Sequence, residues 1–97
     1  MKLVIEIDKL DARPLLDLAD EHDDNIMVVS AHGIDGAEWL TFAIEMTKIL
    51  APPTFALLTV LVTHKKKVIV VRDGKREPLS DSTLKQIEAE AEAADRN

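Results

Sequence analysis

The sequence predicts a single α+β domain, in which a small mixed sheet of three or four strands packs on an apolar helical stretch at about residues 37–63. Three observations predict this class. Short apolar runs alternate with helical patterns, no glycine- or proline-rich linker divides the 97 residues, and apolar side chains make up 46% of them. We expect a short N-terminal helix and a C-terminal helix, with fraying at about residues 89–97 where little can be buried.

The first part of the chain predicts two strands with a helix between them. Residues 2–8 are typical of a half-buried strand, because Leu3, Ile5 and Ile7 fall on one face of an extended chain. A short amphipathic helix is expected at residues 12–21. Residues 26–29 form an uninterrupted apolar run, which is typical of a strand that is buried on both faces.

The middle of the chain predicts the main helical layer. In residues 37–50 the polar side chains recur at intervals of three and four and leave a wide apolar surface, so a helix there has to be covered on more than one side. The pair Pro52-Pro53 is expected to interrupt this helix. Residues 54–63 predict a second helical stretch, and their β-branched side chains leave a strand as the alternative.

The last part predicts a hairpin and a closing helix. Residues 68–71 are a second apolar run and are expected to form a central strand. Asp73-Gly74 is a strong hairpin signal. The returning arm contains Pro78 and is therefore an edge strand at most.

The charge balance excludes several classes of function. The formal net charge is −6, which argues against a general binder of nucleic acid. The chain has three aromatic residues of the Phe, Trp and Tyr type, too few for base stacking, and no cysteine, which fits a cytoplasmic location. Residues 64–76 carry six bases against one acid. We expect the acidic flanks to neutralise this segment, with a phosphate- or membrane-facing strip as the alternative.

Catalytic chemistry has weak support in the sequence. The three histidines lack metal-binding spacings, and no nucleotide-binding motif occurs, so we expect no cofactor and no metal. Ser30, His32 and Asp35 lie close in sequence and suggest a hydrolase or a ligand site in the loop up to Gly36. Triads are assembled from distant parts of a chain, however, and Ser30 lacks the flanking glycines of a nucleophile elbow. We therefore expect no catalytic residues.

A membrane-associated protein is the main alternative. Residues 49–63 carry no charge and are followed by His64-Lys65-Lys66-Lys67, the pattern of an anchor at the inner face of a membrane. A span needs about 20 apolar residues, which is more than this segment offers. A helix that is buried in the domain, or shared between subunits, is the preferred interpretation.

The order of these parts resembles the small effector-associated constant components of bacterial conflict systems. The resemblance rests on Gly36-Ala37-Glu38 through Thr63, followed by the segment from His64-Lys65-Lys66-Lys67 through Val68-Ile69-Val70-Val71 to Asp73-Gly74. It implies a non-enzymatic partner that is encoded beside an effector and a regulator. It carries no catalytic residues over to this chain.

The sequence as a whole predicts a non-catalytic protein-interaction module that self-associates and serves as an accessory component of a bacterial defence or regulatory assembly. The reason is surplus apolar surface on the expected helical layer, since exposed patches of this kind mark interfaces. The partner is a second copy, another protein, or both. For Trp39 and Phe42 burial in the core is an equal alternative. The expected contact residues are Trp39, Phe42, Met46, Phe55 and Leu58.

Overall fold

The computed structural model describes residues 1–32, 36–72 and 74–95, and it confirms the α+β class. Within these ranges five strands, three α-helices and one 3-10 turn follow one another along the chain. The elements are β1 (Lys2–Asp8), η1 (Lys9–Asp11), α1 (Arg13–Glu21), β2 (Ile26–His32), β3 (Glu38–Glu45), α2 (Ala51–Thr63), β4 (Val68–Arg72), β5 (Lys75–Pro78) and α3 (Asp81–Asp95).

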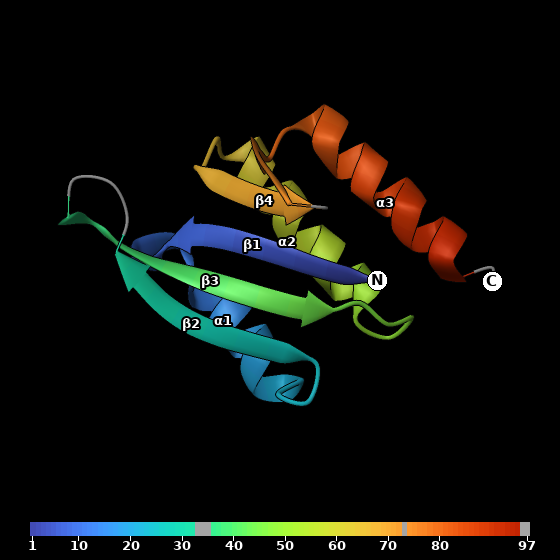
Figure 1. Cartoon of the computed structure of the whole chain (residues 1–97), viewed down its shortest axis with the longest axis horizontal. Helices are drawn as coiled ribbons and strands as arrows, with labels where there is room; N and C mark the ends of the chain where they lie inside the picture. The colour runs from blue at the N-terminus through green and yellow to red at the C-terminus, as the bar shows by residue number, and fades with distance from the viewer. Residues whose placement is uncertain (33–35, 73, 96–97) are drawn as a thin grey trace.

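The strands form one sheet in the order β2-β3-β1-β4-β5, and every neighbouring pair is antiparallel (Figure 1). The sheet is therefore larger than we expected and is not mixed. The series from β1 to β4, with β1 between β3 and β4, has the split βαβ topology of ferredoxin-like domains. This topology hosts many unrelated functions, so the function has to be argued from the surfaces.

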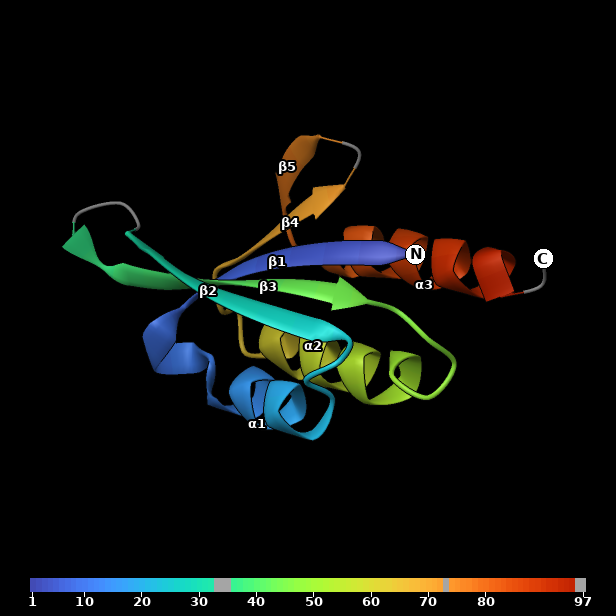
Figure 2. The ribbon, with the colours of Figure 1, turned by 60° about the horizontal axis from the view of Figure 1, so that its bottom comes forward.

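The helices cover one face of the sheet. Both α1 and α2 lie beneath the strands in Figure 2, and α3 packs against α2. Alternate side chains of the strands point toward the helices. Together with apolar side chains of the helices they form one hydrophobic core. On β1 and β3 the inward side chains are Leu3, Ile5, Ile7, Leu40, Phe42 and Ile44.

The prediction of a helix at residues 37–50 is wrong, because residues 38–45 form the strand β3. The segment also alternates with a period of two, because Leu40, Phe42 and Ile44 point inward and the residues between them point outward. As a strand it hydrogen-bonds to β1 on one side and to β2 on the other. This pairing on both sides outweighs a local helical pattern, because a helix here would leave β2 without a partner and β1 paired only with β4.

The second helical stretch is confirmed, with a different role for the prolines. Pro52 and Pro53 lie in the first turn of α2, where missing backbone donors cost nothing, so they begin the helix instead of interrupting one. The helix buries Thr54, Leu58 and Leu61 against the sheet side of the core. Among the described helices, α2 included, none combines the length and apolar character needed to cross a membrane.

The remaining elements agree with the sequence except at one edge of the sheet. β4 lies inside the sheet and β5 forms its edge, as expected. β2, which we expected to be buried on both faces, is the opposite edge strand. The final helix runs to Asp95, so residues 89–95 belong to α3.

The position of Phe42 leads to a test of core against contact surface. Phe42 is completely buried in the middle of β3, whereas Trp39 is half-buried on the other face of the same strand. Phe42→Ala should lower the free energy of unfolding by about 3–5 kcal/mol, because it leaves a cavity in the core. The matched variant Trp39→Ala should cost clearly less. Urea unfolding followed by circular dichroism measures both, and equal losses would contradict this placement of the core.

Candidate functional site

The face of the sheet that the helices leave uncovered is the first candidate surface. Alternation places Val4, Trp39, Ala43, Ile69 and Val71 on this face, which we call the open face, and all five are only half-buried. Thr41 lies among them, and Glu6 forms an ion pair with Arg76 of β5 at 2.7 Å. The same alternation places Lys2 and Glu45 at one end of this face and Asp8 at the other. The open face is thus apolar in its centre and charged at its ends and at its β5 side.

Apolar exposure is highest where the open face meets β2. Met27 and Val29 point to the open face and expose 66% and 51% of their surface. Val28 points to the helix-covered face and is still 37% exposed, because β2 is the last strand of the sheet. Residues 26–31 contain no charge. A long, uncharged and apolar edge strand is a template for pairing with another strand.

The backbone of β2 shows which groups are available for such pairing. Asn25 accepts a hydrogen bond from the N–H of Glu45, and the register continues with Met27 opposite Ala43 and Val29 opposite Thr41. Because hydrogen-bonded pairs alternate in an antiparallel ladder, Met27 and Val29 turn their backbone groups toward β3. Val28 and Ser30 therefore turn theirs outward, along the free edge of the described sheet.

Charge is distributed unequally along β2. β1 and β2 run in the same direction, and α1 returns between them, so the first turn of α1 lies near the end of β2 and its last turn near the start of β2. The start of β2 is flanked by an acidic cluster formed by Asp20, Glu21, Asp23 and Asp24. The end of β2 is flanked by Lys9, which pairs with Glu38 at 3.3 Å, and by Arg13, which pairs with Asp17 at 3.5 Å.

The expected contact residues divide between the core and the surface. Phe42 and Leu58 are completely buried and lie in the core. Trp39 lies on the open face, and Met46 and Phe55 are half-buried beside the core. Thus the structure brings Met46 and Phe55 together, but it separates them from Trp39 by the thickness of the sheet.

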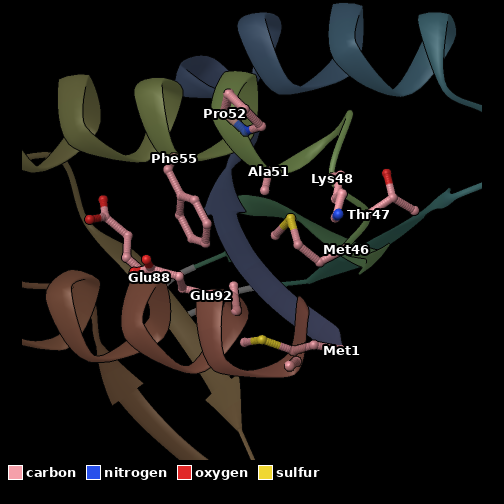
Figure 3. Close-up of a pocket in the computed structure, with 11 residues that line it drawn as sticks. Met1, Met46, Thr47, Lys48, Ala51, Pro52, Phe55, Glu88 and Glu92 are labelled. Carbon is pink, nitrogen blue, oxygen red and sulfur yellow. The ribbon is translucent and has the colours of Figure 1, made fainter. Parts of the chain in front are cut away.

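Met46 and Phe55 line a pocket of about 410 Å³ between α2, α3 and the connection from β3 to α2 (Figure 3). Phe55 points from α2 toward α3, and Met1 closes the side near the start of β1. Glu88 and Glu92 of α3 contribute carboxylates to the lining. The pocket has the size of a small-molecule site, and its apolar floor suits an apolar group.

The residues considered for hydrolytic chemistry are only partly described. The hydroxyl of Ser30 donates a hydrogen bond to the Glu38 carboxylate at 2.7 Å. Asp35 and the His32 side chain lie outside the described residues. Among the side chains that the structure describes, no cluster of three or more His, Cys, Asp or Glu is placed to hold a metal ion.

Arg72 links β4 to β5 and α3 on the β5 side of the sheet. Its guanidinium donates hydrogen bonds to Glu77 of β5 at 2.6 Å, and to Glu90 and Gln86 of α3 at 2.9 and 3.1 Å. The hydrogen bond with Glu77 raises the pKa of Arg72 above its ordinary value, burial acts in the opposite sense, and Glu90 adds to the rise. Since the raised group is a base, this stabilisation is present from neutral pH up to the ordinary pKa of arginine and is lost as the pH rises through the raised pKa.

The sequence patterns did not indicate that Met27 and Val29 are exposed, or that Arg72 links β4 to β5 and α3. The apolar run at residues 26–29 gives no signal that distinguishes an edge strand from a central one. The charged run that contains Arg72 indicates the sign of the charge but not its partners.

The role of Arg72 is testable by substitution. Arg72→Ala should lower the free energy of unfolding by about 1–3 kcal/mol, because one charge-assisted cluster ties β4 to β5 and α3. The control is Arg13→Ala, whose ion pair with Asp17 is solvent-exposed on both sides and should contribute about 0.5 kcal/mol or less. Chemical denaturation measures both variants. Equal effects would show that the Arg72 cluster adds nothing beyond a surface ion pair.

Comparison with known proteins yields no relative: no family model matches the chain, and no curated protein matches its sequence.

Proposed function

We propose that this protein is a non-catalytic interaction module that self-associates and serves as an accessory component of a bacterial defence or regulatory assembly in the cytoplasm. The observation that carries the proposal is the one-sided covering of the sheet. Helices pack on one face, while the open face and the β2 edge leave Met27, Val28 and Val29 in solvent. Contiguous apolar surface of this kind marks interaction sites in small domains.

The physical basis of the proposal differs from the one that the sequence suggested. We expected the surplus apolar surface on a helix at residues 37–50, but that segment is a strand with Leu40, Phe42 and Ile44 buried. The surplus is instead on the sheet, at β2 and across the open face. Of the expected contact residues, Trp39 belongs to this surface.

The place in a defence or regulatory assembly has separate support. It rests on the resemblance of residues 36–74 to effector-associated components, which are non-enzymatic partners. A domain with both an exposed β2 edge and an open sheet face suits such a role. One of these surfaces can hold the copies together while the other binds a different protein.

Self-association is the part of this proposal that is directly measurable. Light scattering after size exclusion, over loading concentrations from about 1 µM to about 1 mM, should give a mass that rises from the 10.8 kDa of one chain toward a multiple of it. Ile49→Lys, in the exposed connection before α2 and away from the open face, should leave this behaviour nearly unchanged. A mass of one chain at every concentration would contradict self-association.

A further inference from the structure

We propose that two copies of this chain pair antiparallel along the outer edges of β2, so that their two sheets become one continuous sheet with Val29 at the two-fold axis. The proposal rests on the proposed self-association and names the surface that carries it. Its partner is a second copy of this chain.

The two edges of the sheet differ in the features that block strand pairing. β5 is four residues long and contains Lys75, Arg76 and Pro78, and charge and proline are the usual protection of an edge. β2 is seven residues long and is uncharged from Ile26 to Ala31. One edge is therefore protected against pairing and the other is open to it.

The register follows from the backbone. Aligning the whole of β2 with its own antiparallel copy places Val28 opposite Ser30 of the second copy, and these are the residues whose backbone groups point outward. Each pair then exchanges its N–H and C=O groups reciprocally. In the same register Val29 lies opposite Val29 of the second copy.

The side chains fit this register. Val29 is 51% exposed in one chain, and at the axis it meets an identical valine on the open face. Apolar β-branched pairs of this kind stabilise neighbouring strands. Met27 lies on the same face, so pairing extends the open face across both copies.

Charge favours antiparallel pairing of two β2 strands over parallel pairing. The acidic cluster (Asp20, Glu21, Asp23 and Asp24) flanks only the start of β2. In the two-fold arrangement it lies beside the end of the other β2, where Lys9 and Arg13 are balanced by Glu38 and Asp17 of their own chain. A parallel pairing would bring the two acidic clusters together. The antiparallel orientation is therefore the one that keeps the two acidic clusters apart.

The pairing also ends at two copies. After both β2 edges are used, the outer strands of the joined sheet are the two β5 strands. These carry the charges and the proline that oppose further strand addition. A two-fold interface of this kind is closed.

The test uses the identity of the residue at the axis. Val29→Lys and Val29→Glu should each weaken the homodimer by roughly tenfold or more, because like charges then lie directly opposite each other. An equimolar mixture of the two variants should restore a one-to-one heterodimer, since opposite charges then meet. Ile49→Lys is the matched control, because Ile49 is also exposed but lies in the connection before α2. The dimer of this variant should have the same dissociation constant as that of the wild type. Sedimentation velocity measures each constant.

The outcomes separate the two proposals. A wild-type protein that remains a single chain at all concentrations overturns self-association itself. A wild-type dimer that persists unchanged in both Val29 variants, or a mixture that forms no heterodimer, overturns the β2 pairing alone.

A second variant covers a failure of the Val29 variants to fold. Val28→Pro removes a backbone donor that the chain itself leaves outward, and proline is tolerated on an edge strand in that orientation. It should keep the circular dichroism spectrum of the wild type and weaken the dimer at least as strongly. A folded Val28→Pro variant with unchanged dimerisation overturns the β2 pairing.

Discussion

The whole structure depends on the placement of both crossover helices on one face of a single antiparallel sheet. α1 connects β1 to β2 and α2 connects β3 to β4, and both helices lie on the same face of the sheet (Figure 2). The core that they share with the strands includes Leu3, Ile5 and Phe42, which are completely buried. The described residues offer no further helix for the opposite face, because α3 packs against α2 and is held to β4 and β5 by Arg72. The same arrangement that forms the core therefore leaves the open face and the β2 edge in solvent.

The fold class and most elements are predictable from local patterns in the sequence. Alternation at Leu3, Ile5 and Ile7 identifies β1. The hairpin signal at Gly74, whose neighbour Asp73 lies outside the described residues, agrees with the antiparallel pairing of β4 and β5. β3 is the failure: residues 38–45 fit both a helical and a strand period, and only the presence of β1 and β2 on either side decides between them. The pairing with β1 joins residues more than 30 positions apart in the sequence, so a local pattern does not reveal it.

The candidate surface is less predictable than the fold, for a related reason. An apolar run such as residues 26–29 has the same composition in a central strand as at an edge. Its exposure depends on strand order, which places β2 last. The expectation of surplus apolar surface remains, but Val28 and Val29 carry it in place of Phe42 and Leu58, which lie in the core. This shift changes the kind of interaction that suits the molecule, from helix packing to the extension of a sheet.

Amide hydrogen exchange along β2 tests the central claim most directly, because neighbouring residues of this strand turn their N–H groups to opposite sides. The N–H groups of Met27 and Val29 bond within the chain and should be protected at every protein concentration. Those of Val28 and Ser30 should exchange quickly in dilute protein and become protected as the concentration rises. Fast exchange at Val28 and Ser30 under conditions where the protein is associated would contradict a shared sheet.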